Sequence, residues 1–294
     1  MANDASSGIG REGVRQPAAL VLSQGSTQQD RVATLSNGFA AAAAVPAPAA
    51  TVKVQVNQLT KCFGDLAVLR DVSFHVKKGE FLCVVGPTGC GKTTFLNLLT
   101  KLIEPTSGEI RIDGELADPG KHNLAFVFQE PSTFPWLTVR ENIEFGLRIK
   151  HYPNEAIRER TTRILDLLGL GKSIDRFPHE LSVSAEQRIV IGRAFAMNPD
   201  LLLMDEPYGQ MDIKLRYYLE DEVVRLWQEL GSTVIFVTHN IEEAVYLAQR
   251  ILILSPKPSS VKEEVVVDLP RPRSYSDPEF IRIRKHVTDM IRWW

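Results

Sequence analysis

Five short segments built almost entirely from apolar residues recur along this chain. They are Phe81–Val85, Leu124–Phe128, Leu201–Met204, Thr233–Val237 and Ile251–Leu254. A strand is apolar throughout when both faces of a parallel sheet are covered. Because stretches with a helical pattern separate these segments, we expect an α/β fold built around a mostly parallel sheet.

A second strand pattern lies around the first apolar segment. Residues 52–56, 68–76 and 108–114 alternate between apolar and polar side chains. Such alternation is typical of strands with one buried face. We therefore expect an antiparallel β layer beside the parallel sheet.

Composition divides the chain into three parts. Residues 1–50 are rich in alanine, proline and serine and poor in large apolar residues, so we expect a flexible tail. Residues 51–255 carry the strand pattern, with an expected helical insertion at about 138–197. Residues 256–294 form a C-terminal extension, in which Asp277-Pro278 reads as the start of a terminal helix.

Charge and cysteine content exclude several classes of protein. The chain has 34 basic and 36 acidic residues, a net charge of −2, which argues against a nucleic-acid coat or a polybasic membrane anchor. The three cysteines form no CxxC pair, so we expect neither a zinc site nor a disulfide framework. No apolar run reaches the roughly 18 residues that a transmembrane helix needs. If the protein works at a membrane, another chain spans it.

A phosphate-binding motif follows the first apolar segment. Residues 86–93 read GPTGCGKT, which fits G-x-x-x-x-G-K-[ST] in full, between a predicted strand and a predicted helix. Glycines let the backbone curl so that amide N–H groups face phosphate oxygens, and the helix N-terminus favours negative charge. We expect Lys92 to reach the β- and γ-phosphates and Thr93 to coordinate Mg²⁺. The nucleotide-binding set is Gly86, Pro87, Thr88, Gly89, Cys90, Gly91, Lys92, Thr93 and Thr94.

Two acids end another apolar segment. Asp205 and Glu206 directly follow Leu201–Met204, at the edge of a parallel sheet where ligands bind. We expect Asp205 to hold Mg²⁺ and Glu206 to polarise the attacking water as general base. Taken alone, two solvated acids at the end of a strand would be the simpler interpretation. The phosphate-binding motif favours the catalytic one.

The order of these motifs resembles the ATPase subunit of an ABC transporter, a P-loop NTPase. The resemblance extends from about Lys53 to Leu254, and it rests on Gly86–Thr93, Gln129, Leu181-Ser182, Asp205-Glu206 and His239. Two further segments, FPWLTV at 134–139 and FPHELS at 177–182, are similar to the importers of the nitrate, sulfonate, taurine and bicarbonate group.

The resemblance implies roles for single residues. Phe63 matches the aromatic residue that stacks on adenine, and Gln129 matches the glutamine near Mg²⁺ and the attacking water. Ser182 belongs to the signature segment that contacts nucleotide bound by the opposite subunit. Asp212 matches the aspartate at the dimer interface, and His239 matches the histidine on the γ-phosphate. Outside this pattern, a lone phenylalanine is more often core and a lone histidine more often surface.

The resemblance also implies the setting of the protein. We expect a peripheral ATPase subunit at the cytoplasmic face of the inner membrane, with ATP and Mg²⁺ as cofactors. Its partners would be polytopic permease subunits, a second ATPase subunit and, indirectly, a solute-binding protein, with no nucleic acid. It would power the import of a small anion. The alternative is an ATP-gated regulatory or binding module with little turnover.

The signature segment departs from the family pattern. The family reads Leu-Ser-Gly-Gly-Gln, whereas residues 181–185 read LSVSA. If φ at Val183 is positive, we expect strain of about 1–2 kcal/mol. Ser184-x-x-Gln187 also fits a capping box, which would start a helix at Ser184. Two interpretations remain open: neutral variation in an active homodimer, or a poor signature in a heterodimer or a slow ATPase, and we predict the second.

Cys90 lies inside the phosphate-binding motif, before a predicted helix. That position lowers the pKa of a thiol and raises its nucleophilicity. We therefore predict that alkylation of Cys90 blocks nucleotide binding and that bound MgATP protects it. The alternative is a small, inert packing residue.

Overall fold

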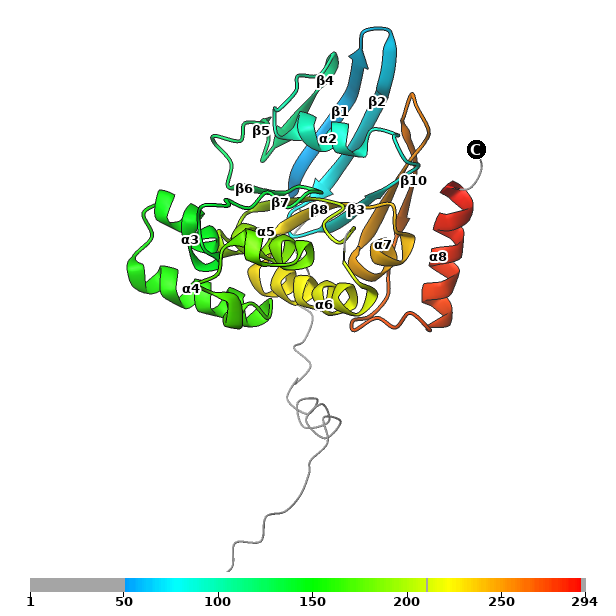
Figure 1. Cartoon of the computed structure of the whole chain (residues 1–294). Helices are drawn as coiled ribbons and strands as arrows, with labels where there is room; N and C mark the ends of the chain where they lie inside the picture. Colours follow the sequence, from blue (N-terminus) through cyan, green and yellow to red (C-terminus); the bar gives the residue numbers. More distant parts are fainter. Residues whose placement is uncertain (1–50, 210, 292–294) are drawn as a thin grey trace, which may run out of the picture. The chain divides into compact units, whose positions relative to one another are not determined.

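Two β-sheets form the framework of the described chain (Figure 1). The structure is a computed structural model that describes residues 51–209 and 211–291. The tail predicted at 1–50 lies outside the described residues, as do residues 210 and 292–294.

The larger sheet has six strands in the order β10-β9-β3-β8-β7-β6. Five of them are parallel and β10 pairs antiparallel with β9, so the expected mostly parallel sheet is confirmed. The strands are β3 (Phe81–Val85), β6 (Leu124–Val127), β7 (Leu201–Asp205), β8 (Thr233–Val237), β9 (Arg250–Leu254) and β10 (Val261–Val266).

The smaller sheet is antiparallel, with strands in the order β2-β1-β4-β5. Its strands are β1 (Val52–Phe63), β2 (Leu66–Lys77), β4 (Ser107–Ile112) and β5 (Glu115–Leu116). It is the antiparallel layer that the alternating pattern predicts. The helix α2 (Lys92–Leu99) lies between this sheet and the six-stranded one (Figure 1).

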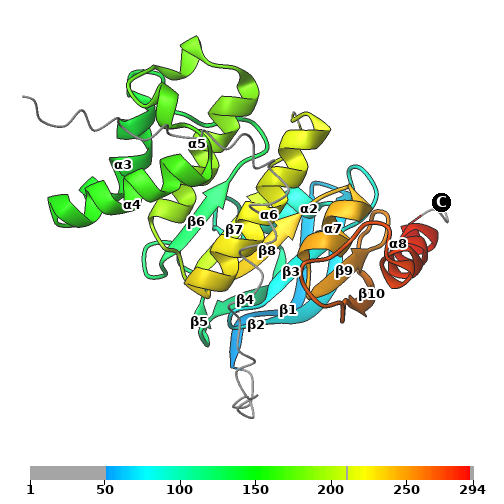
Figure 2. The ribbon, with the colours of Figure 1, turned by 90° about the horizontal axis from the view of Figure 1, so that it is seen from below.

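Helices cover the other face of the six-stranded sheet (Figure 2). These are α5 (Val183–Ala196), α6 (Ile213–Leu230) and α7 (Ile241–Leu247). Two more helices, α3 (Val139–Ile149) and α4 (Asn154–Leu167), pack with α5 to one side. Short 3₁₀ turns lie between α4 and α5, at η1 (Gly171–Ser173) and η2 (Pro178–Glu180).

Strand β3 explains why the central segments are apolar throughout. Phe81, Cys83 and Val85 point into the core under α5, α6 and α7. Leu82 and Val84 point into the second core, which α2 and the antiparallel sheet cover. Alternate residues are therefore buried on opposite faces, and no position along the strand faces solvent.

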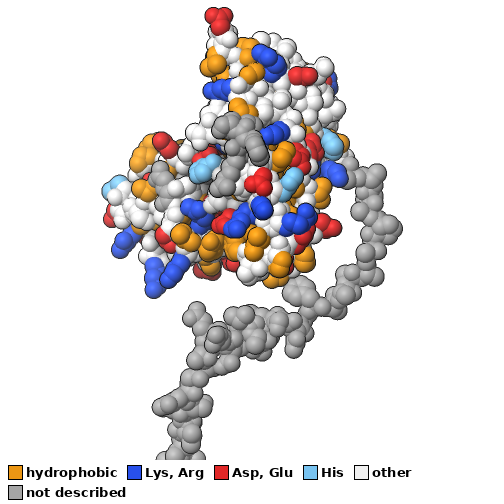
Figure 3. Space-filling model, turned by 90° about the vertical axis from the view of Figure 1, so that its right-hand side faces the viewer, with side chains coloured by type: hydrophobic (Ala, Val, Ile, Leu, Met, Phe, Trp, Pro, Cys, Tyr) orange, Lys and Arg blue, Asp and Glu red, His pale blue; other side chains and the backbone are white. Residues whose placement is uncertain are grey.

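The C-terminal part of the chain adds to both the sheet and the core. Strand β10 extends the sheet at its edge, although its sequence, VKEEVV, gives little strand signal. Helix α8 (Pro278–Ile291) places Phe280, Ile283 and Val287 in the core beside α7, and the carboxylate of Asp277 accepts the backbone N–H of Glu279 at 2.7 Å. On this side of the molecule, basic and acidic side chains are interspersed (Figure 3).

Three parallel strands end at one edge of the sheet, and this edge gathers the predicted site. The motif at 86–93 follows β3, Asp205 ends β7, and one residue separates His239 from the end of β8. Within residues 51–209 and 211–291, no helix is both long and apolar enough to cross a bilayer.

Candidate functional site

The loop at 86–93 has the backbone that a phosphate-binding loop requires. Gly89 has φ of 76° and Gly91 has φ of 108°, values that side-chain-bearing residues rarely adopt. A Cβ on Gly91 would also lie 2.8 Å from Cγ1 of Val68. Helix α2 begins at the next residue, so its unpaired N-terminal amides face the loop.

Lys92 is buried within this loop. Its Nζ donates to the carbonyl oxygens of Gly86 at 3.1 Å and Pro87 at 3.3 Å. The backbone of the loop therefore holds the ammonium group in place at the start of α2. The positive charge and the amides together favour a polyanion.

Asp205 lies beneath the loop and is 3% exposed. Burial raises the pKa of its carboxyl group, and a hydrogen bond from Thr93 acts in the opposite direction. One carboxylate oxygen, Oδ1, is buried and has no hydrogen-bond partner. A buried oxygen that lacks a partner beside a threonine hydroxyl fits Mg²⁺, which takes hard oxygen ligands and completes its shell with water and phosphate oxygens.

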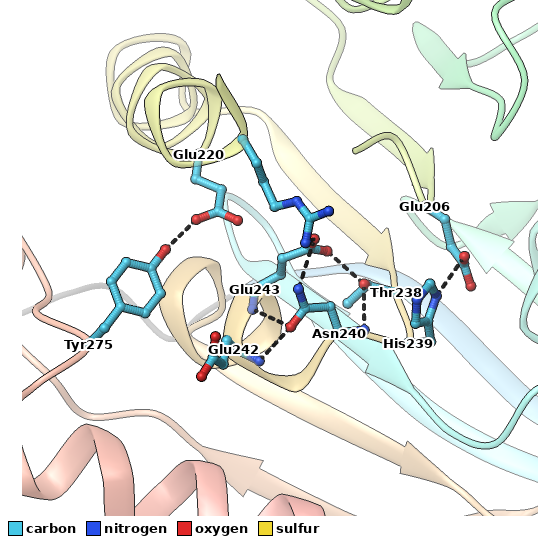
Figure 4. Close-up of polar contacts among 9 residues, drawn as sticks. Glu206, Glu220, Thr238, His239, Asn240, Glu242, Glu243 and Tyr275 are labelled. Atoms are coloured by element: carbon cyan, nitrogen blue, oxygen red, sulfur yellow. Dashed lines mark hydrogen bonds and ion pairs between the residues drawn. The ribbon is translucent and has the colours of Figure 1, made fainter. Parts of the chain in front are cut away.

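Glu206 and His239 contact each other at the mouth of the site (Figure 4). Nδ1 of His239 lies 2.7 Å from Oε2 of Glu206. Glu206 has φ of 46°, a strained value for a residue with a side chain, and its N–H donates to the carbonyl of Val237 on β8. Strain of this kind concentrates at functional sites.

A cavity of about 450 Å³ unites most of the predicted residues. It is lined by Thr88, Gly89, Gly91, Lys92, Thr93, Thr94, Gln129, Glu206, His239 and Lys257. Its volume falls in the range of small-molecule and cofactor sites. The phosphate-binding loop, the expected base and the expected histidine therefore face one space.

Seven predicted residues do not line this cavity: Gly86, Pro87 and Cys90 of the loop, Asp205 beneath it, and the more distant Phe63, Ser182 and Asp212. Phe63, at the end of β1, is about half exposed, and Nζ of Lys61 lies 4.8 Å from the centre of its ring. Ser182 and Asp212 are the exposed N-caps of α5 and α6. Their predicted roles toward adenine and toward an opposite subunit stay predictions.

Lys257 is the lining residue that the sequence interpretation missed. It lies between β9 and β10 in a loop that Ser259 ties to the phosphate-binding loop. The hydroxyl of Ser259 donates to the carbonyl of Cys90, and its N–H donates to the carbonyl of Val68 at 2.9 Å. The sequence did contain a signal for Lys257. It follows Ile251–Leu254, which was predicted as a parallel strand, and the carboxyl end of that strand lies at the same edge of the sheet as the site.

The expected lowering of the pKa of the Cys90 thiol is wrong. The side chain is buried, and burial raises the pKa of the thiol despite the lowering effect of the neighbouring Lys92. Its backbone N–H donates to the carbonyl of Pro87 at 3.1 Å. These observations favour the alternative interpretation, a small packing residue, and the effect of alkylation on nucleotide binding stays a prediction.

In the signature segment the condition for strain at Val183 is not met, and the capping box predicted at Ser184 is wrong. Val183 is the first residue of α5 and does not have positive φ, so it carries no strain of that kind. The N-cap lies two residues earlier than predicted, because Ser182 caps the helix and its hydroxyl accepts the N–H of Ala185 at 3.3 Å. The hydroxyl of Ser184 is buried without a hydrogen-bond partner.

Comparison with known proteins gives the same assignment as the site. A family model described as ABC transporter matches residues 69–209. A nitrate import ATP-binding protein of Synechocystis sp. is 35% identical over 252 residues, 81% of this chain and 95% of that protein. An aliphatic sulfonates import ATP-binding protein of Bacillus cereus is 39% identical over 245 residues, 82% of this chain and 96% of that protein.

A solved structure extends the comparison to the fold. A dimeric, post-hydrolysis state of an ATP-binding cassette bound to ADP and Pi matches with a TM-score of 0.66 and 32% identity, over 74% of this chain and 100% of that chain. The chain thus belongs to the ABC transporter family, as an ATP-binding subunit. The family that the motif order resembles and the predicted α/β fold are confirmed.

Proposed function

We propose that this chain hydrolyses ATP to power the import of a small anion by a membrane ABC transporter. The observation that carries the proposal is the single cavity lined by the phosphate-binding loop, Glu206 and His239. The relatives named for nitrate and sulfonate import support a small anion as the solute. The partners are polytopic permease subunits, a second ATPase subunit and, indirectly, a solute-binding protein, with the chain peripheral at the cytoplasmic face of the inner membrane.

The chemistry follows from the positions of the side chains. The amides of the loop and Lys92 bind the phosphates, while Glu206 accepts a proton from the attacking water as the bond to the ADP oxygen breaks. Nδ1 of His239 contacts Oε2 of Glu206, so Nε2 is the ring nitrogen that remains for the γ-phosphate, to which it donates when it carries a proton. Thr93, Asp205 and Gln129 would hold Mg²⁺, which supplies positive charge against the transferred phosphoryl group.

Replacing the base tests the proposal. Glu206→Gln should retain ATP binding in calorimetry and lose turnover by about 100-fold or more, because an amide cannot accept the proton of water. Glu155→Gln, on the exposed first turn of α4, is the matched control and should leave both unchanged. A Glu206→Gln protein that turns over ATP at the wild-type rate would show that the base is misassigned. Co-purification with a polytopic protein from native membranes tests the transport role.

The signature segment bears on the dimer. Because Ser182 caps α5 and Val183 is unstrained, we propose that a homodimer is active despite the missing glycines. The double change of Val183→Gly and Ser184→Gly should then alter ATP turnover by less than about threefold. A tenfold gain would favour the other interpretation, a poor signature that needs a partner of a different kind.

A further inference from the structure

The loop that carries His239 is anchored on a buried carboxylate. Glu243 lies on the first turn of α7 and is 5% exposed. Its Oε2 accepts the hydroxyl of Thr238 at 2.7 Å, and its Oε1 accepts Nδ2 of Asn240 at 3.2 Å (Figure 4). Both neighbours of His239 in the chain are therefore bound to the same side chain.

Further hydrogen bonds close this arrangement around the backbone. The N–H of Asn240 donates to the hydroxyl of Thr238 at 2.9 Å. Oδ1 of Asn240 accepts the N–H groups of Glu242 and Glu243, so Asn240 is the N-cap of α7. Thr238 is itself buried, and its N–H donates to the carbonyl of Val84 on β3. The loop is thus tied to both the sheet and the helix.

An arginine from α6 completes the surroundings of Glu243. Nη1 of Arg216 lies 3.3 Å from Oε1 of Glu243. Burial raises the pKa of this carboxyl group, and the hydrogen bond from Thr238 and the charge of Arg216 act against that rise. Arg216 is one turn from Asp212, the N-cap of α6. The pair therefore connects the start of α6 to the loop of His239.

The neighbouring Glu242 makes different contacts from Glu243. Glu242 is half-buried, and its carboxylate pairs with Arg284 on α8. Only its backbone N–H takes part in the cap. The two adjacent glutamates thus have separate surroundings, and a change of the Glu242 side chain is a matched control for Glu243.

We propose that Thr238 and Glu243 are positioning residues, which hold His239 against Glu206 for the reaction. The inference rests on the proposed function, because it assigns His239 to ATP hydrolysis. His239 is itself largely exposed, so its own packing does not fix its place. The hydrogen bonds that its two neighbours, Thr238 and Asn240, make with the buried Glu243 fix its place instead. Small displacements of a reacting group cost large factors in rate, whereas binding by the phosphate loop does not depend on this anchor.

Three variants of the full chain test the inference. Thr238→Val keeps the shape of the side chain and removes its hydroxyl, whereas Thr238→Ser keeps the hydroxyl. Glu243→Gln removes the charge opposite Arg216. We expect kcat to fall about tenfold in Thr238→Val and Glu243→Gln, with the calorimetric Kd for ATP within about twofold of wild type. Thr238→Ser and the control Glu242→Gln should retain wild-type kcat. The milder Glu243→Gln keeps the test valid if Thr238→Val fails to fold.

The outcomes separate the inference from the proposed function. An active wild-type chain with wild-type kcat in both Thr238→Val and Glu243→Gln overturns the inference alone. Equal losses of ATP affinity and kcat, or no rescue by Thr238→Ser, overturn it too, since they indicate a general structural role. A wild-type chain that binds and hydrolyses no ATP overturns the proposed function and the inference together.

Discussion

Glu220 on α6 carries a carboxyl group that the folded chain holds protonated at neutral pH. The side chain is 1% exposed, and the hydroxyl of Tyr275 donates to its Oε2 (Figure 4). Burial raises its pKa to about 8, against the lowering effect of the Tyr275 hydrogen bond. The carboxylates of Glu243 and Asp221 add to the rise, and Arg216 opposes it. Folding therefore favours the neutral acid.

The size of the effect follows from the two pKa values. An unfolded chain releases this proton near its ordinary value of 4.5, whereas the folded chain keeps it up to about 8. Between pH 5.5 and 7.5 the folded state therefore binds one more proton, and its stability falls by about 1.4 kcal/mol per pH unit. The loss over this window is about 2.7 kcal/mol, and below pH 4.5 the penalty is absent.

Glu220→Gln removes this titration and keeps an oxygen that accepts the hydroxyl of Tyr275. Urea unfolding at pH 5.5 and 7.5 should show that the free energy of unfolding of Glu220→Gln, relative to wild type, rises by about 2–3 kcal/mol between the two pH values. Glu155→Gln, an exposed change, should show no such rise. Parallel pH dependences of Glu220→Gln and wild type would refute the reasoning.

Two further predictions concern the edge of the nucleotide cavity. Lys257→Met removes a cation that lines the cavity and should weaken ATP and ADP binding about three- to tenfold in calorimetry. Lys285→Met, an exposed change on α8, should leave binding unchanged. Equal affinities of Lys257→Met and wild type would exclude Lys257 from the site. Alkylation followed by mass spectrometry should label the half-exposed Cys62 well before the buried Cys90, and equal labelling would show that the loop opens readily.

The sheet and the motifs were predictable because they depend on local patterns. Apolar runs such as Phe81–Val85 predict strands covered on both faces, since both sets of alternate side chains must be buried. The motif at 86–93 predicts its own backbone, because only glycine adopts the φ of Gly91 beside Val68 without strain or a clash. The place of Asp205 and Glu206 in the site was predictable because they end a parallel strand, where ligands bind.

Other features were not predictable, because they depend on what packs around a residue. Cys90 has the sequence position of a reactive thiol, yet its pKa is raised because the surrounding core excludes water. The φ of Val183 depends on where α5 begins, and Ser182 rather than Ser184 caps that helix. Edge strand β10 gives little apolar pattern, because none of its residues is fully buried.

The amino-acid sequence by itself determined the fold class, the phosphate-binding loop and the acid pair, since each is encoded by neighbouring residues. The tertiary structure alone decided which distant side chains meet. It placed Lys257 on the cavity and joined Arg216, Thr238 and Glu243 around the loop of His239. Lys257 and Arg216 reach groups far from them in the chain, whereas the bond between Thr238 and Glu243 spans only five residues but depends on their burial, a property that no single stretch of sequence possesses.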